Sequence, residues 1–172
     1  MILRGLLALL SAVLTVAATA GTFQFCGIRV NASASLPIGL YRITSDQSAK
    51  LVEFCPAEPF GSLSANRAYR GKGNCPDGAE PLMKPIVAVA GDTIEFSAAG
   101  IVVNGMLLPN SAPLRFDTKH RPLQHWQFGK FTVPSETVWV ISTYNPRSFD
   151  SRYFGPVTTA DIQFHLRPLV TE

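Results

Sequence analysis

The feature that most constrains this chain is a continuous apolar segment at its start. Arg4 is followed by an uncharged stretch from Gly5 to Ile28. At a helical rise of about 1.5 Å per residue this stretch reaches about 36 Å, enough to cross a hydrocarbon layer of about 30 Å. Residues 6–18 also fit a secretory hydrophobic region, and Ala18-Thr19-Ala20 fits a small-residue cleavage site. Residues 1–28 are therefore predicted to be an N-terminal hydrophobic helix, either a membrane anchor or a removable signal peptide, and a buried core helix is the less favoured interpretation.

Composition favours one folded domain for residues 29–172. The chain has 172 residues, of which 47% are hydrophobic and 16% are charged. This is too apolar for a disordered chain, and the length suits a single core. The formal charge is only +3 and the basic residues are scattered. We therefore expect no nucleic acid among its partners, because a nucleic-acid arm would concentrate its basic residues.

Cysteine usage agrees with export. Of three cysteines, Cys55 and Cys75 lie in Pro- and Gly-rich segments of the exported part. They suit a disulfide in an oxidising compartment, and two free thiols are the alternative. Cys26 lies at the end of the apolar segment, and no C-x-x-C occurs, so the spacing matches no zinc pattern. The sequence indicates no metal or organic cofactor.

The part of the chain after the apolar segment has the pattern of a mainly β protein. Asn104-Gly105 separates two apolar runs, which is a strong hairpin signal because both turn residues tolerate positive φ. We expect a long surface loop at residues 56–80, and residues 159–164 are the only helix candidate after residue 30. Residues 132–133 and 137–143 are expected to form a strand pair. The further strand candidates are residues 35–43, 51–54, 86–89, 93–96, 100–103 and 106–108. This pattern predicts an antiparallel sheet folded on itself as a sandwich or open barrel.

Familiar catalytic motifs are missing from the sequence. It has no G-x-S-x-G elbow, no H-E-x-x-H, no S-x-x-K and no phosphate-binding glycine loop. His120, His125 and His165 occur in no catalytic pattern, and we interpret them as surface or structural residues. A Ser-His-Asp triad therefore has weak support.

Three segments carry residues suited to chemistry, at 31–41, 82–92 and 145–156. Taken singly, each has an ordinary explanation. The serines of the first could belong to a linker, Lys84 of the second could be a solvated strand-edge charge, and Asp150 and Arg152 of the third could be a surface ion pair of little energetic consequence.

Together and in this order, the segments resemble the signal peptidase I superfamily, and more closely the TraF-type peptidases of plasmid conjugation systems. The resemblance covers essentially the whole chain. It includes the anchor, a Ser-x-Pro-x-Gly-Leu-Tyr box at 35–41, a lysine strand ending in Gly91-Asp92, a Val-Asn-Gly hairpin, and Ser-Phe-Asp-Ser-Arg-Tyr-Phe-Gly-Pro at 148–156. It implies a signal peptidase I-type fold, a folded antiparallel sheet or open barrel.

The resemblance also implies roles for individual residues. Ser35 matches the nucleophile and Lys84 the general base, while Ser33 matches a hydroxyl that helps to hold the oxyanion. The chain departs from general signal peptidases, which have one more residue between nucleophile and proline, usually Arg in place of Pro85, and Pro in place of Ala90. These departures favour the conjugation branch, and they leave Ser33 as the alternative nucleophile.

Ser148 and Asp150 match the pair that supports the lysine, with Arg152 pairing the aspartate. A lysine acts as a base only when it is neutral, so its pKa must fall, and burial among apolar neighbours achieves this. We expect Ser148 to orient the amine of Lys84 by a hydrogen bond. Asp150 should pair with Arg152 instead of touching the amine, because a bare carboxylate would raise the lysine pKa.

By this resemblance the protein would be a serine endopeptidase at the periplasmic face of the bacterial inner membrane. It would process an exported pre-protein, most simply the conjugative pilin, with maturation and in some systems cyclisation, as part of the conjugation and secretion machinery. One alternative is a general type I signal peptidase. A self-cleaving repressor of the LexA type is disfavoured, because a membrane segment stands where a DNA-binding helix-turn-helix would be. A non-enzymatic, membrane-anchored scaffold of a pilus or secretion complex is the alternative of another class.

Overall fold

A computed structural model describes residues 27–172. The predicted anchor or signal peptide at 1–28 and Cys26 therefore lie outside the described residues, apart from Gly27 and Ile28. In the described range, no helix is long and apolar enough to cross a membrane.

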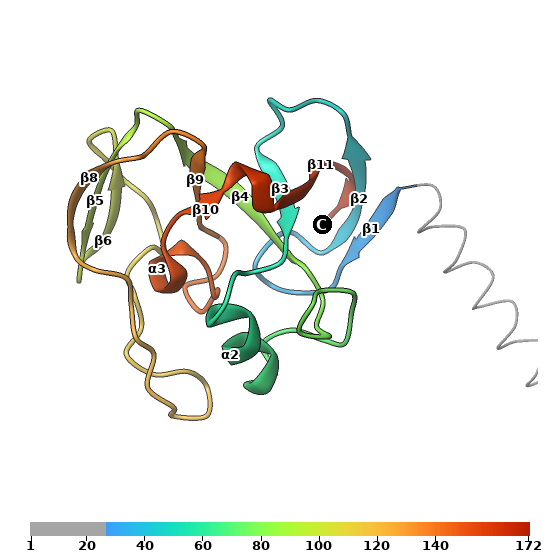
Figure 1. The fold of residues 1–172 in the computed structure, drawn as a ribbon, viewed down its shortest axis with the longest axis horizontal. Helices are drawn as coiled ribbons and strands as arrows, with labels where there is room; N and C mark the ends of the chain where they lie inside the picture. The colour runs from blue at the N-terminus through green and yellow to red at the C-terminus, as the bar shows by residue number, and fades with distance from the viewer. Residues whose placement is uncertain (1–26) are drawn as a thin grey trace, which may run out of the picture.

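The described chain forms two antiparallel sheets with few helices, which confirms the mainly β prediction (Figure 1). The larger sheet has seven strands in the order β1-β2-β11-β3-β4-β9-β10. Its strands are β1 (Ile28–Asn31), β2 (Gly39–Thr44), β3 (Leu51–Phe54), β4 (Leu82–Val89), β9 (Thr137–Val140), β10 (Val157–Thr158) and β11 (Ile162–Thr171).

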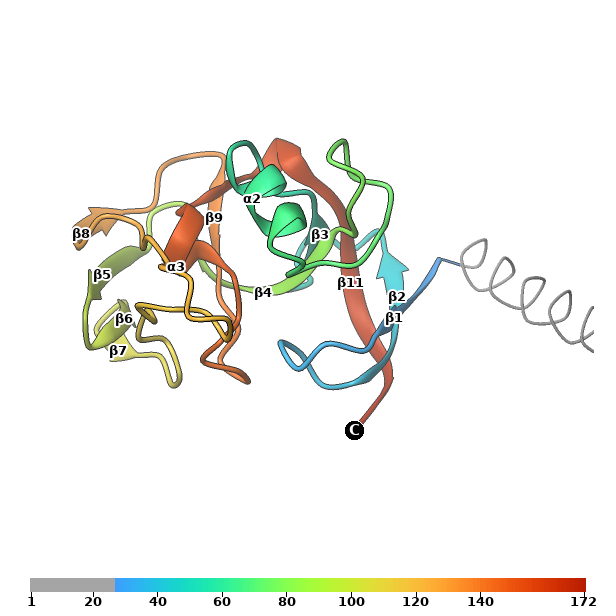
Figure 2. The ribbon, with the colours of Figure 1, turned by 90° about the horizontal axis from the view of Figure 1, so that it is seen from below.

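The smaller sheet has four strands in the order β7-β6-β5-β8. These are β5 (Thr93–Ser97), β6 (Gly100–Val103), β7 (Met106–Leu107) and β8 (Gly129–Thr132). Both views place this sheet and the β1–β2 pair at opposite ends of the molecule (Figures 1 and 2). The helices are α2 (Phe60–Asn66) and α3 (Ser151–Phe154), with a 3-10 turn at Thr159–Asp161.

The larger sheet is strongly curled. Arg29 on β1 and Glu53 on β3 are separated by β2 and β11 in the strand order, yet Arg29 Nε lies 2.7 Å from Glu53 Oε2. A flat sheet would hold these two backbones about 14 Å apart, with both side chains perpendicular to it. The ion pair can form only because the sheet closes toward itself as an open half-barrel.

Strand β9 buries both of its faces. Successive residues of a strand point to opposite sides of the sheet. Val138 and Val140 belong to a first apolar cluster that includes residues of α3 and is covered by α2, whereas Trp139 and Ile141 belong to a second cluster shared with the smaller sheet. β9 therefore packs the two sheets together, and β4 does the same with Leu82 in the first cluster and Ala88 in the second.

The hairpin predicted at Asn104-Gly105 is confirmed. β6 and β7 pair with Val103 opposite Met106. Asn104 and Gly105 have φ angles of 49° and 84°. Positive φ at both central residues is what a tight two-residue hairpin turn requires, and these two residue types adopt it at little cost.

The prediction of a long loop at residues 56–80 is wrong in part, because α2 occupies its first half. The helical sequence contains a glycine and two serines, which are poor helix formers. Its stability comes from tertiary contacts. Phe60 and Leu63 pack against the first apolar cluster, and Arg70 donates hydrogen bonds to Gly61 O and Ser64 Oγ at 2.8 and 2.9 Å.

Two further expectations are wrong. Residues 132–133 and 137–143 do not pair with one another, since β8 pairs with β5 and β9 pairs with β4 and β10. Residues 159–164 form no α-helix. A 3-10 turn there leads into β11, the longest strand, which pairs with β2 and β3. In both cases the pairing partner is distant in sequence, so local pattern could not identify it.

A disulfide joins Cys55 to Cys75 across 20 residues of sequence. Cys55 directly follows β3, whereas Cys75 lies in a loop that folds back on itself, with Gly73 N donating to Gly78 O at 3.0 Å and Cys75 N donating to Ala79 O at 2.9 Å. The disulfide therefore fastens this loop to the end of a core strand.

We predict that replacing Cys55 and Cys75 by serine lowers the stability of the folded domain by about 3 kcal/mol, because the unfolded chain gains the freedom of the closed loop. Thermal and denaturant unfolding of the purified protein measure the change. Cys26→Ser is the matched control, since it removes a thiol outside the bond. Equal melting temperatures for the double variant and this control would contradict the prediction.

Candidate active site

The turn that carries Ser35 is organised by Asn31, the last residue of β1, which is buried. Asn31 Nδ2 donates to the carbonyls of Ser33, Leu36 and Pro37 at 2.9 to 3.1 Å. Its Oδ1 accepts the backbone N–H of Ser33 at 3.1 Å and the Ser33 hydroxyl at 2.8 Å. One side chain thus holds five polar groups of the turn, which fixes its shape.

The turn presents Ser35 to Lys84 on β4. Lys84 Nζ lies 2.8 Å from Ser35 Oγ, although the two residues are 49 positions apart in sequence. Ser33 Oγ lies 2.9 Å from Ser35 Oγ. Ser35 and Lys84 are both buried, with 8% and 3% of their surface exposed. The structure therefore brings the predicted nucleophile, base and oxyanion residue together in one chain of hydrogen bonds, which runs from the buried Lys84 to the exposed Ser33.

Strand geometry explains the burial of Lys84. Residues at i−2 and i+2 share its face of β4, and these are Leu82 and Ile86, which pack into the first apolar cluster. Removal of the amine from water lowers the pKa of Lys84 from 10.5 to about 8; the negative charge of Asp150 opposes this shift and the positive charge of Arg152 adds to it. Lys84 is therefore able to lose its proton near neutral pH.

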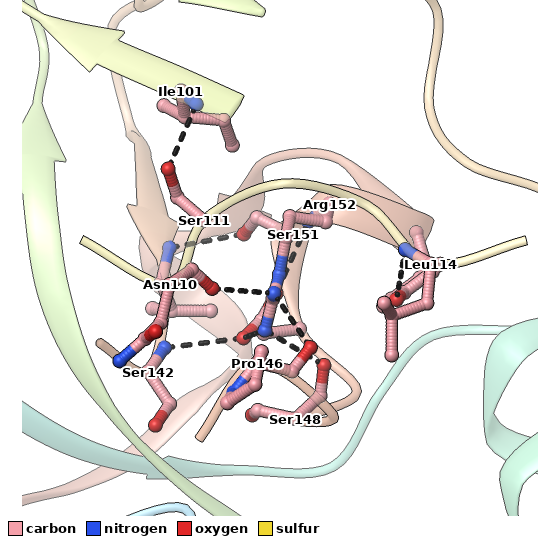
Figure 3. A network of polar contacts seen from close by, with 12 residues as sticks. Ile101, Asn110, Ser111, Leu114, Ser142, Pro146, Ser148, Ser151 and Arg152 are labelled. Atoms are coloured by element: carbon pink, nitrogen blue, oxygen red, sulfur yellow. Dashed lines mark hydrogen bonds and ion pairs between the residues drawn. The ribbon is translucent and has the colours of Figure 1, made fainter. Parts of the chain in front are cut away.

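Asp150 and Arg152 form a fully buried ion pair, and Figure 3 shows the polar contacts around Arg152. Arg152 Nε and Nη2 donate to the two carboxylate oxygens of Asp150, each at 2.8 Å. The remaining guanidinium hydrogens reach the carbonyls of Asn110 and Pro146 at 2.9 Å and of Ser148 at 3.0 Å. As the sequence predicts, the aspartate pairs with the arginine, and its hydrogen bonds go to Arg152 and Ser142.

Ser148 differs from its predicted role. Its hydroxyl is buried and has no hydrogen-bond partner among the described residues. The expected hydrogen bond to the Lys84 amine is not formed. The amine donates to Ser35, and Arg152 donates to the Ser148 carbonyl. Ser148 nevertheless lines the same cleft as Ser35 and Lys84.

The cleft has a volume of about 960 Å³. Its walls include the serine turn, the start of β4, the loop fastened by the disulfide, and residues 145–149. A volume at the upper end of the usual range for ligand sites suits an extended peptide better than a small molecule. His120, His125 and His165 are not among the residues that line the cleft, and the described chain contains no group of three or more His, Cys, Asp or Glu residues that could hold a metal ion.

Comparison with known proteins shows the family of this chain. The family described as signal peptidase, peptidase S26, matches residues 2–166. The chain belongs to this family. Within the peptidase S26 family, the relatives of this chain include a plasmid transfer protein TraF from Escherichia coli, 38% identical over 149 residues that cover 84% of this chain and 83% of that protein.

The chain is also similar to a second TraF protein and to two signal peptidases. A probable conjugal transfer protein TraF from Sinorhizobium fredii is 35% identical, covering 91% of this chain and 84% of that protein. A probable signal peptidase I from Mycobacterium leprae is 34% identical, covering 66% of this chain and 45% of that protein. A solved signal peptidase I from Enterococcus faecalis is 21% identical, with a TM-score of 0.39, over 73% of this chain and 99% of that one. The resemblance to TraF-type members of the peptidase S26 family is confirmed.

Two residues of the site had no signal strong enough to predict them. Asn31 stands at the head of the serine box, where an Asx residue able to cap a turn is a weak cue. Ser142 donates its hydroxyl to the carbonyl of Ser35 at 2.5 Å across 107 residues of sequence. Nothing in the Ile-Ser-Thr sequence around Ser142 distinguishes it from any serine after a strand.

We predict that the burial of Lys84 makes stability depend on pH. The pKa of Lys84 is lower in the folded chain than in the unfolded chain, so between pH 8 and 10.5 the unfolded chain binds more protons and stability rises with pH. Relative to Lys84→Met, wild type should gain about 2 kcal/mol between pH 8 and 9.5, with no relative change between pH 6 and 7. Denaturant unfolding across this range measures it. Parallel curves for the two proteins would rule out a depressed lysine pKa.

Proposed function

We propose that this protein is a membrane-associated serine endopeptidase whose catalytic dyad is Ser35 and Lys84. The observation that carries the proposal is the 2.8 Å contact between Lys84 Nζ and Ser35 Oγ at a buried site that opens into a cleft. A serine hydroxyl is a weak nucleophile until a base within hydrogen-bond reach takes its proton. Membership of the peptidase S26 family supports peptide-bond hydrolysis as the reaction.

In the first step, neutral Lys84 accepts the Ser35 proton while Ser35 Oγ attacks the carbonyl carbon of the scissile peptide. The oxyanion that forms would be held by the Ser35 backbone N–H and the Ser33 hydroxyl. The Lys84 ammonium then gives its proton to the leaving amine, which leaves an ester on Ser35. Water, activated by the neutral amine of Lys84, hydrolyses this ester and restores the free serine.

The Ser33 hydroxyl must turn for this role. At rest it donates to Asn31 Oδ1 at 2.8 Å. A hydroxyl carries a single proton, so Ser33 cannot donate to Asn31 and to an oxyanion at the same time. Because Asn31 Oδ1 also accepts the Ser33 backbone N–H, it remains partnered when the hydroxyl rotates away. The rotation therefore leaves no buried acceptor unsatisfied.

The TraF relatives support a peptidase-like role in conjugal transfer, and we propose the conjugative pilin precursor as the substrate. Residues 1–28 would anchor the chain, or direct its export, and residues 29–172 would form one peptidase domain on the periplasmic face of the inner membrane. Ser35 follows the apolar segment by only a few residues, so the dyad would lie where an exported chain emerges.

The ester on Ser35 admits two outcomes. Attack by water gives a mature linear pilin, whereas attack by the amino terminus of the same chain gives a ring. The mycobacterial signal peptidase relative favours a second candidate, a general signal peptidase with many substrates. Cleavage of several unrelated pre-proteins by the purified protein would support that candidate over a dedicated pilin peptidase.

We predict that Ser35→Ala and Lys84→Ala each reduce cleavage of the pilin precursor to background. Ser33→Ala should lower kcat by about 10²- to 10³-fold, the usual cost of one oxyanion donor. Cleavage is followed by mass spectrometry of the precursor encoded with this protein. Ser45→Ala and Lys119→Ala, at exposed positions, are the matched controls. Full processing by a folded Ser35→Ala, Lys84→Ala double variant would favour the scaffold interpretation.

We predict that kcat/KM rises with pH to a plateau, with an apparent midpoint near the folded pKa of Lys84, about 8. The rise follows because only the neutral amine accepts the serine proton, and at pH 7 roughly a tenth of the molecules carry it. Initial rates between pH 6 and 9.5 measure the profile. A rate independent of pH in this range would exclude Lys84 as the general base.

A further inference from the structure

We infer that Ser142 is a positioning residue that holds the backbone of the nucleophile in place and couples it to the buried Asp150–Arg152 pair. The inference rests on the proposed function, because positioning matters only if Ser35 is the nucleophile. Ser142 does not contact Lys84 in the hydrogen bonds of the site, so its effect would pass through Ser35 alone.

Ser142 stands where three segments of the site meet. It follows the end of β9 by two residues and is fully buried. Its hydroxyl donates to Ser35 O at 2.5 Å, and its backbone N–H donates to Asp150 Oδ2 at 3.1 Å. The residue before it, Ile141, donates its N–H to Pro85 O at 3.1 Å, beside the lysine on β4. Ser142 is thus tied to the nucleophile turn, the ion pair and the lysine strand.

The hydroxyl of Ser142 donates a hydrogen bond to a carbonyl of the turn that Asn31 does not contact. Asn31 holds the carbonyls of Ser33, Leu36 and Pro37. Of the two carbonyls between Ser33 and Leu36, that of Ser35 is held by Ser142. Fixing the Ser35 carbonyl limits rotation of the peptide that follows the nucleophile, and so limits where Ser35 Oγ can lie. Catalysis by a dyad depends on that placement, since a misplacement of about 1 Å can cost about 10²-fold in rate.

Through the same contacts Asp150 affects the position of Ser35 without acting through Lys84. The Arg152 guanidinium holds both oxygens of the Asp150 carboxylate, and both side chains are fully buried. A carboxylate fixed in this way fixes the Ser142 N–H that donates to it. The ion pair therefore positions Ser142, and Ser142 positions Ser35.

The experiment uses p-nitrophenyl acetate as the probe with the full-length purified protein. Ser35 Oγ attacks the acetyl carbonyl and p-nitrophenolate leaves, while the serine proton passes to Lys84, and water then hydrolyses the acetyl ester. Ser35→Ala defines the background. The test variant is Ser142→Ala, and Ser142→Thr keeps the hydroxyl. Ser111→Ala is the matched control, because Ser111 is another buried serine that donates to a carbonyl, Leu108 O, at 2.6 Å.

We predict that Ser142→Ala lowers kcat by about 10- to 100-fold with KM within about twofold, and leaves the pH midpoint of the reaction unchanged. Ser142→Thr should recover most of the activity. Ser111→Ala should lower the melting temperature at least as much, because the Ser111 hydroxyl makes two hydrogen bonds, accepting from Ile101 N and donating to Leu108 O, while its kcat stays within about twofold of wild type. If Ser142→Ala fails to fold, the same comparison with Ser142→Cys, a weaker donor, replaces it.

The outcomes separate this inference from the proposed function. A wild-type kcat in Ser142→Ala, or equal losses in Ser142→Ala and Ser111→Ala, would overturn the positioning role while a silent Ser35→Ala still supports the dyad. A shifted pH midpoint in Ser142→Ala would also overturn it, because Ser142 would then act on the lysine. Hydrolysis by Ser35→Ala at the wild-type rate would overturn the proposed function itself.

Discussion

The buried pairing of Asp150 with Arg152 is the interaction on which the rest of the site depends. Both side chains are completely removed from water, which costs several kcal/mol for each ion unless its partners replace the lost hydration. Here the replacement is extensive, with two parallel hydrogen bonds inside the pair and carbonyls of Asn110, Pro146 and Ser148 around the guanidinium. Because Asn110 is 42 residues from Arg152 in sequence, whereas Pro146 and Ser148 lie just before it, satisfying one arginine fixes the relative positions of two loops.

The pair also sets the electrostatic environment of Lys84. A lone carboxylate near the amine would stabilise the ammonium form and remove its capacity as a base. Directing both carboxylate oxygens to Arg152 leaves the two opposite charges to act on Lys84 in opposite directions, and desolvation is the largest influence on its pKa. Asp150 can therefore organise the site without holding Lys84 in its protonated form.

Features that depend on neighbouring residues could be predicted from the sequence, whereas features that depend on contacts between distant residues could not. The Asn104-Gly105 turn and the strands around it follow from residue preferences within a few positions. Helix α2 and the long strand β11 have sequences that fit other structures better, and they exist because of what packs or pairs against them. The contact between Ser35 and Lys84 was predictable only by resemblance to a family, because no spacing along the chain implies it. Ser142 carried no such resemblance and became visible only in three dimensions.

The two-sided burial of β9 has a consequence for how this molecule can come apart. A strand whose alternate residues complete two different apolar clusters leaves no boundary along which one sheet could open while the other stays closed. The two sheets should therefore behave as one cooperative unit, and the backbone amides of β9 should be among the last to exchange with solvent. The rigidity of β9 should extend to the residues that directly follow it, and Ser142 lies two residues beyond its end.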